Sequence, residues 1–454
     1  MVYDLIVIGA GPGGYVGAER AGHAGLSALL IEKRALGGVC LNEGCIPSKT
    51  LLNSAKIADY AKNGNQYGVS AENVKLDHTA VINRKNKAVR TLVAGVSMKM
   101  KNNGVTVVNG EAVITGRSTE GYQVKVDATV YTGKRLMIAT GSEPAMPAIP
   151  GLKEGYAYGF VLTNREILDL KTLPEKLVII GGGVIGLEMA SYFNSAGCKV
   201  TVVEMLDHIA GPTDREISSI LYNNYKKAGV DFKLSAKVTE ITSDSVVFET
   251  SEGVQTVAAD KVLVSIGRKP KIEGLGLENI HVQTERGRIV TDEHMQTNIP
   301  EVYAVGDVNG VSMLAHTAYR EAEVCINTIL GQKDRMRYHA IPSVIYTNPE
   351  VGSVGETEES AKEKGLEFDI VKLPLAYSGR YVAETSRGDG IIKVLIHRKY
   401  RTLLGVHIIG SYASEIIYGA AMMIETEMRV EDIRQIVFPH PTVGEVIREA
   451  MWEL

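Results

Sequence analysis

The sequence predicts an α/β fold with two Rossmann-like dinucleotide-binding domains. Near the N-terminus an apolar strand, a glycine-rich loop, a helix, a second strand and an acidic residue follow one another, in the order that dinucleotide binding requires. The same order returns further along the 454-residue chain, with the same interval from the last loop glycine to the acid. Unrelated glycine clusters have no reason to share that interval, so the repeat predicts two dinucleotide sites.

Each copy has three expected elements around its loop. In the first copy we expect a strand over 3–8, a helix over 15–24 and a strand over 27–31. In the second copy we expect a strand over 177–180, a helix over 187–196 and a strand over 199–203. The alternative for a glycine triplet by itself is a tight structural turn, but here both strands and the acid accompany it.

The three glycines of each loop have different physical roles. The first permits a tight turn, the second lets the backbone approach a pyrophosphate, and the third lets the helix pack closely on the strand. The N-terminus of the helix then faces the phosphates. The glycines in these positions are Gly9, Gly11 and Gly14 in the first loop, and Gly181, Gly183 and Gly186 in the second.

An acidic residue ends the second strand of each copy. Glu32 and Glu204 are expected to accept hydrogen bonds from the ribose hydroxyls of their dinucleotides. The residues directly after Glu204 include no arginine that could neutralise a 2′-phosphate, so the second site favours NAD over NADP. A lysine or arginine that folds in from elsewhere would alter this preference.

Two cysteines, Cys40 and Cys45, follow the second strand of the first copy closely. They lie about one helical turn apart, with Gly44 between them, so an S–S bond can form if the backbone bends. A buried reduced pair and a metal site are the alternatives. Zinc would need two further ligands nearby, and the other cysteines, Cys198 and Cys325, are isolated. The spacing therefore favours a redox pair.

The position of the cysteines also assigns the two sites. A flavin can exchange electron pairs with a disulfide, so the first site, beside the cysteines, is expected to hold FAD. The nicotinamide nucleotide, NAD, then belongs to the second site.

Composition limits the other possibilities. The net charge is −4, and no basic block or basic-aromatic stripe indicates nucleic acid. No apolar run is long enough to span a bilayer, and the N-terminus has neither a signal peptide nor a transit peptide. Few cysteines in a long chain do not form a secreted disulfide framework. We therefore expect a cytoplasmic protein that binds neither nucleic acid nor a membrane.

The chain resembles the pyridine nucleotide-disulfide oxidoreductases, and among them the dihydrolipoamide dehydrogenase family, over essentially its whole length. The resemblance rests on the two glycine loops, the cysteine block over 37–49 and four shorter motifs. These motifs are Ala-Thr-Gly-Ser at 139–142, Tyr-Ala-Val-Gly-Asp at 303–307, His-Pro at 440–441 and Glu445. Val39, where relatives usually carry threonine, departs from the pattern.

The resemblance implies roles near the flavin. Cys40 is expected to exchange with the substrate disulfide and Cys45 to face the flavin ring. Lys49 shares the face of Cys45 if the helix continues through Pro47, and can lend it positive charge. The flavin-binding residues implied are Thr140, Gly141, Asp307 and Ala315. As an isolated residue, Asp307 would be read as part of a turn.

Glu188 has two interpretations. The family has an acid near the nicotinamide that pairs with the lysine, and Glu188 is the candidate for it. The alternative is an acid in the first turn of the second loop's helix, where it stabilises the helix N-terminus.

His440 and Glu445 are the candidate base and its orienting carboxylate. A dithiol needs a base to take its proton, and an imidazole held by a carboxylate suits that exchange. From these residues alone, a proline-bracketed turn with a buried histidine is an equal alternative, and the cysteine pair favours the base. In the family this pair reaches the disulfide of the opposite subunit, which implies a homodimer.

The resemblance completes the organisation and the expected function. We expect an FAD-binding domain over 1–144, an NAD-binding domain over 145–266, a central segment over 267–331 that completes the FAD domain, and an α+β dimerisation domain over 332–454. No metal is expected. The expected reaction is oxidation of protein-bound dihydrolipoamide to lipoamide with reduction of NAD, and the lipoyl partner is expected to be a separate protein.

Two alternatives remain. A disulfide or metal reductase of the same build is disfavoured, because the chain has no further cysteine pair at its C-terminus and no arginines directly after Glu204. A flavoprotein that serves only as a docking subunit would have no need to keep both thiols, Lys49 and His440 together.

Overall fold

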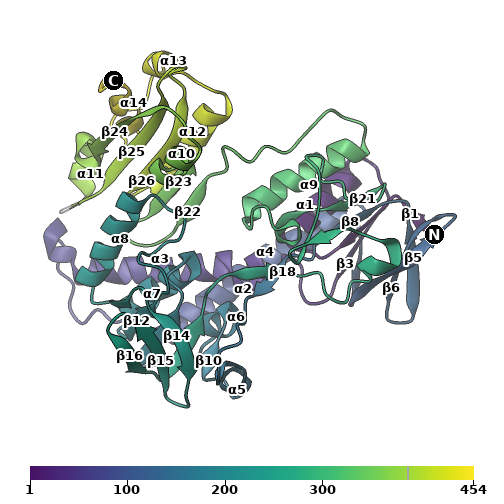
Figure 1. Ribbon diagram of the computed structural model, residues 1–454, viewed down its shortest axis with the longest axis horizontal. Coiled ribbons are helices and arrows are strands. Elements are labelled where there is room, and N and C mark those ends of the chain that lie inside the picture. Colours follow the sequence, from purple (N-terminus) through teal and green to yellow (C-terminus); the bar gives the residue numbers. More distant parts are fainter. Residues whose placement is uncertain (386–387) are drawn as a thin grey trace. The chain divides into compact units, whose positions relative to one another are not determined.

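The computed structural model describes residues 1–385 and 388–454 (Figure 1). Contacts group the chain into two compact units, each assembled from three separate stretches. Unit 1 consists of residues 1–50, 82–145 and 267–337. Unit 2 consists of residues 51–81, 146–266 and 338–454.

The main sheet of unit 1 is parallel and five-stranded. Its strands, in spatial order, are β21 (Val302–Ala304), β8 (Leu136–Ile138), β2 (Leu5–Ile8), β3 (Ala28–Glu32) and β4 (Thr106–Asn109). Residues of the central strands are apolar and buried at nearly every position, as a parallel sheet covered on both faces requires. Helix α1 (Pro12–His23) connects β2 with β3 and packs against α9 (Ala315–Ile329).

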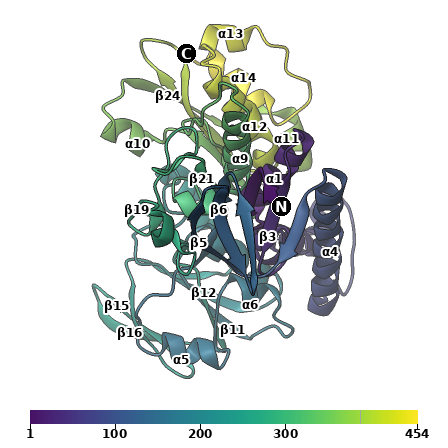
Figure 2. The ribbon, with the colours of Figure 1, turned by 90° about the vertical axis from the view of Figure 1, so that its right-hand side faces the viewer.

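Smaller sheets complete unit 1. One consists of β1 (Val2–Tyr3), β7 (Thr129–Gly133), β6 (Gly121–Val126) and β5 (Ala112–Ser118), and Figure 2 shows β5 and β6 from a second side. The two-stranded sheets pair β9 (Ser142–Pro144) with β18 (Arg268–Pro270), and β19 (Thr284–Glu285) with β20 (Arg288–Ile289). The β9–β18 pairing joins segments that are far apart in the sequence.

The main sheet of unit 2 repeats this pattern. Its parallel strands, in spatial order, are β10 (Val161–Leu162), β17 (Lys261–Val264), β11 (Lys176–Ile180), β12 (Lys199–Val203) and β13 (Asp231–Lys233). Helix α7 (Val184–Ser195) connects β11 with β12, as α1 connects β2 with β3. An antiparallel sheet of β14 (Lys237–Ile241), β15 (Ser245–Thr250) and β16 (Gly253–Ala258) follows α8 (Arg215–Lys227). The predicted fold with two Rossmann-like domains is thus confirmed.

The C-terminal part of unit 2 contains an antiparallel sheet. Its strands, in spatial order, are β22 (Ser343–Ile345), β23 (Val351–Gly355), β26 (Leu403–Ile409), β25 (Ile391–His397) and β24 (Phe368–Pro374). Its apolar core includes side chains from α12 (Ala413–Glu425), α13 (Val430–Arg434) and α14 (Glu445–Trp452). Strands and helices that follow one another in this way give the predicted α+β architecture.

The remaining α-helices are spread along the chain. They are α2 (Gly38–Glu43), α3 (Cys45–Lys62), α4 (His78–Asn102), α5 (Leu152–Ala157), α6 (Asn164–Leu168), α10 (Glu358–Glu363) and α11 (Gly379–Glu384). Among the described residues, no helix combines the length and apolarity needed to cross a membrane.

The ends of several predicted elements differ from the sequence analysis; the helix expected over 187–196, for example, is α7 (Val184–Ser195). The strand expected over 3–8 is interrupted at Asp4, whose carboxylate accepts hydrogen bonds from the backbone N–H and the hydroxyl of Ser27 at 3.0 and 2.8 Å. The helix expected over 15–24 begins earlier, at Pro12, because proline suits the first helical position, where no N–H is needed.

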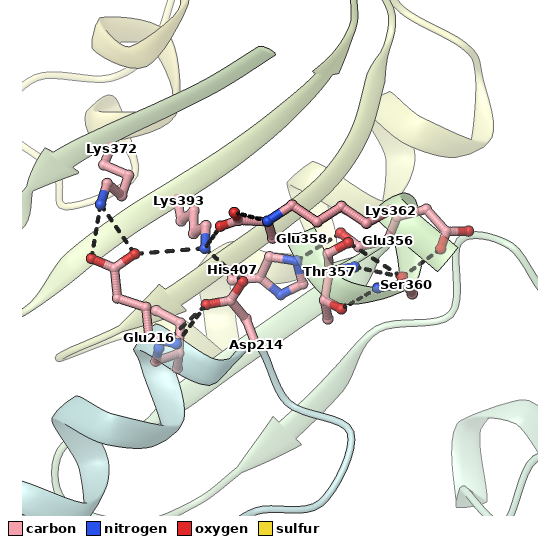
Figure 3. Close-up of polar contacts among 11 residues, drawn as sticks. Asp214, Glu216, Glu356, Thr357, Glu358, Ser360, Lys362, Lys372, Lys393 and His407 are labelled. Carbon is pink, nitrogen blue, oxygen red and sulfur yellow. Dashed lines mark hydrogen bonds and ion pairs between the residues drawn. The ribbon is translucent and has the colours of Figure 1, made fainter. Parts of the chain in front are cut away.

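A buried cation joins two parts of unit 2 (Figure 3). The side chain of Lys393, on β25, is only 2% exposed. Its ammonium nitrogen lies 2.8 Å from Asp214 Oδ2 and 2.7 Å from Glu358 Oε2. Asp214 is fully buried and also caps α8 by accepting from the backbone N–H of Glu216 at 3.0 Å. This network holds the N-terminus of α8 to the C-terminal antiparallel sheet, which contains β25.

Candidate active site

The first glycine loop leaves no room for side chains where the chain turns. Gly9 has a φ of +100°, and a Cβ on Gly14 would lie 1.8 Å from the carbonyl oxygen of Gly9. Gly11, the N-cap of α1, has open space where its Cβ would be, and the first turn of α1 contains no acidic residue. The N-terminus of α1 can therefore receive a pyrophosphate.

The second glycine loop has the same geometry. Gly181 has a φ of +103°, and a Cβ on Gly186 would lie 2.2 Å from the carbonyl oxygen of Gly181. Gly183 caps α7 and again faces open space. The repeated loops fit one dinucleotide each.

Glu32 lies at the carboxyl end of β3, where it is tied to the first loop. Its carboxylate accepts hydrogen bonds from the backbone N–H groups of Ala10 and Arg34, at 2.7 and 2.8 Å. Each carboxylate oxygen has a second lone pair, so Glu32 can still accept from a ribose hydroxyl.

Glu204 has the same arrangement at the end of β12. It accepts from the backbone N–H groups of Gly182 and Leu206, at 2.6 and 2.8 Å. Arg215 of α8 approaches the segment after Glu204, where its guanidinium lies 2.9 Å from Asp207 Oδ1. Asp207 thus balances the charge of an arginine that the local sequence does not place there.

A polar chain connects the Ala-Thr-Gly-Ser and Gly-Asp motifs. The Ser142 hydroxyl donates to Asp307 Oδ2 at 2.5 Å, and Arg268 Nε donates to the same hydroxyl at 2.7 Å. Thr140 donates to the carbonyl oxygen of Lys271 at 2.7 Å, so the β9–β18 pairing also fixes the segment before Gly141. This arrangement orients the Asp307 carboxylate.

Sequence reasoning did not single out three residues of this region. Ser142 belongs to the Ala-Thr-Gly-Ser motif but had no predicted role of its own. Arg268 directly follows Gly267, shortly after β17, and this glycine could have indicated a turn with a functional side chain. Glu321 is fully buried and accepts from the Gly306 backbone N–H and from Asn309 Nδ2, at 2.5 and 3.0 Å. Glu321 lies inside α9, and nothing near it in the sequence indicated a role at the site.

Ala315 is the first residue of α9. The preceding Leu314 has extended backbone, and no acidic residue lies in the first turn. The N-terminal N–H groups of α9 therefore lie at the end of the segment that contains Asp307.

The cysteine helix docks on the first glycine loop. The Gly37 N–H donates to the carbonyl oxygen of Ala10 at 2.8 Å, and a Cβ on Gly38 would lie 2.6 Å from Gly11 Cα. Cys40 follows in α2. This close approach places the redox candidate beside the predicted FAD loop.

Cys40 and Cys45 are half-buried free thiols, which corresponds to the reduced form of the pair. A hydrogen bond with the Cys45 side chain, together with burial, raises the pKa of Cys40, whereas the charge of Lys49 acts to lower that pKa. Helix α3 does continue through Pro47, which occupies its third position, where no intrahelical N–H bond is lost. Lys49 thus stands one turn after Cys45.

Glu188 is not in the first turn of α7, contrary to the sequence analysis. The helix begins at Val184, and its first turn contains no acidic residue. Glu188 is 3% exposed and accepts from the Tyr346 backbone N–H at 3.1 Å. A first-turn dipole contact therefore does not explain this acid, and its buried carboxylate is tied to the start of the antiparallel sheet within unit 2.

His440 and Glu445 form a direct hydrogen bond. His440 Nδ1 lies 2.8 Å from Glu445 Oε1, and the other carboxylate oxygen accepts from the Thr442 N–H at 2.8 Å. The hydrogen bond from the Thr442 backbone N–H, and to a smaller extent the one with His440, lowers the pKa of Glu445 below its usual value. The imidazole side chain is 76% exposed, so the histidine is presented to solvent and not buried in a turn.

The predicted site residues are divided between the units. Unit 1 contains the first loop, Glu32, the cysteine pair, Lys49, Asp307 and Ala315. Unit 2 contains the second loop, Glu188, Glu204, His440 and Glu445. Among the described residues, no group of three or more histidine, cysteine or acidic side chains could hold a metal ion.

Comparison with protein families gives two matches. Residues 3–322 match the family described as pyridine nucleotide-disulphide oxidoreductase. Residues 341–451 match the dimerisation domain of the same family.

Named relatives match over nearly the whole chain. A dihydrolipoyl dehydrogenase of Mycoplasma pneumoniae is 39% identical over 452 residues, covering 99% of this chain and 98% of the relative. A mitochondrial dihydrolipoyl dehydrogenase of Pisum sativum is 40% identical over 461 residues, covering 98% and 90%.

Solved structures agree with the fold. The Cu(II) complex of the HOCl-induced flavoprotein disulfide reductase RclA from Escherichia coli superimposes with a TM-score of 0.88 at 27% identity, covering 100% of both chains. LpdA from Mycobacterium tuberculosis, at 24% identity and a TM-score of 0.89 over 99% of both chains, supports the fold alone. With its repeated loops, its cysteine pair and these matches, the chain belongs to the pyridine nucleotide-disulphide oxidoreductase family.

Proposed function

We propose that the protein is a dihydrolipoyl dehydrogenase, which oxidises protein-bound dihydrolipoamide to lipoamide and reduces NAD to NADH. The observation that carries the proposal is the docking of the Cys40 helix on the first glycine loop, through Gly37 and Gly38. The names of the full-length relatives from Mycoplasma pneumoniae and Pisum sativum support the substrate class.

The cysteine pair exchanges electrons with the dithiol. One substrate sulfur attacks Sγ of Cys40 in the oxidised pair, which breaks the Cys40–Cys45 bond and releases Cys45 as a thiolate. The second substrate sulfur attacks the first, which forms the lipoyl disulfide and releases Cys40 as a thiolate. The substrate loses two electrons and two protons, and the pair gains the two electrons.

Further residues of the chain are proposed to assist this exchange. Bound FAD would accept the electron pair from the reduced cysteines and pass it to NAD as a hydride. Lys49, one turn after Cys45, stabilises the thiolate that Cys45 becomes. His440 takes a substrate proton, and Glu445 orients its imidazole by accepting from Nδ1. Glu188 is the acid proposed near the nicotinamide.

Replacing Glu445 with glutamine should lower dithiol-dependent turnover by roughly 10- to 100-fold. A hydrogen bond to a charged group contributes about 1.5–3 kcal/mol, and the protonated imidazole would lose its anionic partner. The measurement is NADH formation from dihydrolipoamide across a pH series. Reduction of ferricyanide by NADH needs no substrate base and should stay unchanged. An equal loss in both reactions would contradict the role of Glu445 as an orienting residue.

The loss should also depend on pH. The pKa of Glu445 is lowered in the folded protein, so its ionised form, and with it the contact to His440, is present above its ordinary pKa and is lost as the pH falls through the lowered value. The wild-type protein should therefore keep this charged contact across the neutral range, whereas the glutamine variant offers His440 only a neutral acceptor at every pH.

Glu204 is proposed to select NAD over NADP. In a Glu204→Gln variant the amide cannot repeat both hydrogen bonds from Gly182 and Leu206, and the charge that repels a 2′-phosphate is lost. We expect kcat/KM for NAD to fall by about tenfold or more and the preference over NADP to narrow. Glu32→Gln, the matching change in the first copy, is the control: it should weaken FAD retention without changing the ratio of NAD to NADP. A Glu204 variant with an unchanged ratio would contradict the role.

We also propose a homodimer, a lipoylated partner protein and a cytoplasmic location. The homodimer is supported by the match of residues 341–451 to a dimerisation domain and by exposed apolar side chains there, among them Tyr418, Met422 and Val437. A reducing compartment suits the free thiols of Cys198 and Cys325.

The direct test mixes the FAD-loaded protein with dihydrolipoamide and NAD. NADH formation supports the proposal, and rates should rise when a lipoylated protein domain replaces free dihydrolipoamide. If flavin is bound and no NADH appears, the assignment is wrong. Oxidation of NADPH by glutathione disulfide, in place of the dihydrolipoamide reaction, would identify another disulfide reductase of the same build.

A further inference from the structure

Glu321 is an acidic side chain inside the core of unit 1. It lies in α9 and is fully buried. Its carboxylate oxygen Oε2 accepts hydrogen bonds from the Gly306 backbone N–H at 2.5 Å and from Asn309 Nδ2 at 3.0 Å. Burial of a carboxylate is costly unless hydrogen bonds compensate for the lost water, and an apolar side chain could fill the same space without that cost.

The two donors belong to one short turn, Gly306–Asn309, which begins shortly after β21. Gly306 begins the turn in the left-handed region, with a φ of +75°, a conformation that glycine adopts readily. The Glu321 carboxylate therefore joins the first and the last residue of this turn. It fixes the backbone on both sides of Asp307, the second residue of the turn.

Asp307 is also held through its side chain, and it follows a segment that contacts α1. The Ser142 hydroxyl donates to Asp307 Oδ2 at 2.5 Å. A carboxylate oxygen has further lone pairs, so Asp307 can also accept from a hydroxyl group of a ligand. A Cβ on Gly13, in the first turn of α1, would lie 2.9 Å from Val305 Cγ2, two residues before Asp307. Glu321 thus fixes an acid close to the predicted FAD loop.

We propose that Glu321 is a positioning residue for FAD. By holding Gly306 and Asn309, it keeps the Asp307 carboxylate where that carboxylate can accept a hydrogen bond from a hydroxyl group of bound FAD. The length of the Glu321 side chain matters more than its charge, because one oxygen atom makes both contacts. The inference rests on the proposed function through a single step, the binding of FAD by Asp307.

The test measures how fast the holoenzyme releases FAD, as the FAD that passes an ultrafiltration membrane over time. The temperature is one at which circular dichroism shows the variants to be folded. Glu321→Asp keeps the charge but is one methylene shorter, so release should be about tenfold faster or more, since buried donors are left unsatisfied. Glu321→Gln keeps the length and an oxygen that can stand in the place of Oε2, so release should stay close to the wild-type rate.

A double-variant cycle tests whether Glu321 acts through Asp307. Asp307→Ala alone should release FAD faster than the wild type, and adding Glu321→Asp to it should bring no further increase. Asn309→Ala removes one of the two donors and leaves the buried carboxylate in place, so it should raise the release rate by a smaller factor. Glu323→Asp, the same change at a partly exposed acid of α9 that lies 3.4 Å from Arg20, is the control and should match the wild type.

Four outcomes would overturn a part of this scheme. Wild-type release by Glu321→Asp and Asn309→Ala, or an additive increase in the double variant, would show that Glu321 serves only the stability of the core. Faster release from Glu321→Gln than from Glu321→Asp would show that charge matters and not geometry. If Asp307→Ala keeps the wild-type rate, the flavin role of Asp307 is wrong and the inference fails with it. A wild-type protein that retains FAD but forms no NADH from dihydrolipoamide would contradict the proposed function alone.

Discussion

Replacing Cys45 with serine should leave a folded, yellow protein that cannot oxidise dihydrolipoamide. A serine hydroxyl cannot form the S–S bond through which the pair would accept electrons, so no partial route remains. Loss of a nucleophile in an enzyme that works through a covalent intermediate removes several orders of magnitude of rate, and we expect a fall of at least about 10³-fold. The measurement is NADH formation, with the flavin absorbance as a check on cofactor content.

The chain offers a matched control for this change. Cys198 is also a free thiol, but it is buried in unit 2 after α7, and burial raises its pKa to about 11. Cys198→Ala should therefore keep wild-type turnover. A Cys45→Ser protein with normal activity would show that the cysteines are not the redox pair. It would also favour the alternative of a flavoprotein that only docks into a larger assembly.

Replacing Lys393 with methionine should destabilise unit 2 by about 3–5 kcal/mol, the cost of leaving a buried charge without its partner. The fully buried Asp214 carboxylate would lose the ammonium group 2.8 Å away, and Glu358 would lose one of its two lysine contacts. Urea and thermal unfolding of the holoenzyme measure the effect. A multidomain protein need not unfold in one step, so the transition that includes α8 and the antiparallel sheet is the one to follow.

Two comparison variants separate a buried charge from a surface one. Lys372 pairs with Glu216 at 3.0 Å but is 51% exposed, so Lys372→Met should cost at most about 1 kcal/mol. The double variant Lys393→Met/Asp214→Asn should recover part of the loss, because it removes the orphaned charge and keeps a side chain that can cap α8. Equal effects for Lys372 and Lys393 would contradict the account of the network.

The network also predicts how the stability of unit 2 depends on pH. Hydrogen bonds with Lys362 and Lys393 lower the pKa of Glu358 to about 2. The contribution of Glu358 to the stability of unit 2 is therefore complete above its ordinary pKa near 4.5 and is lost as the pH falls towards 2. The pKa of Lys393 is raised by Asp214 and Glu358 against the opposing effect of burial. Its contribution is therefore complete below its ordinary value and is lost only in strong alkali.

The sequence predicted the two glycine loops well because their requirements are local. Gly9 and Gly14 are fixed by a turn and a close backbone contact that only glycine allows, and Gly181 and Gly186 repeat them. The fold class followed from that repeat. The sequence analysis placed Glu188 in the first turn of its helix, but this residue lies in the second turn of α7. A glycine loop marks the start of a helix only to within a few residues.

Other parts depend on contacts between distant segments, which a single sequence does not show. Arg268 meets Ser142 only because β18 pairs with β9. Lys393 stands in a strand whose other inner positions are apolar, and nothing near it in the sequence indicates the acids that receive it. Tyr319 meets Tyr15 because α9 packs on α1.

Thiol mapping tests the central claim most directly. The FAD-loaded protein is alkylated before and after one equivalent of dihydrolipoamide is added without oxygen, and the modified peptides are identified by mass spectrometry. The account predicts that Cys40 and Cys45 are joined and protected beforehand, and that the dithiol makes this pair reactive while Cys198 and Cys325 stay unmodified. Reduction of the flavin with no change at Cys40 or Cys45 would contradict it.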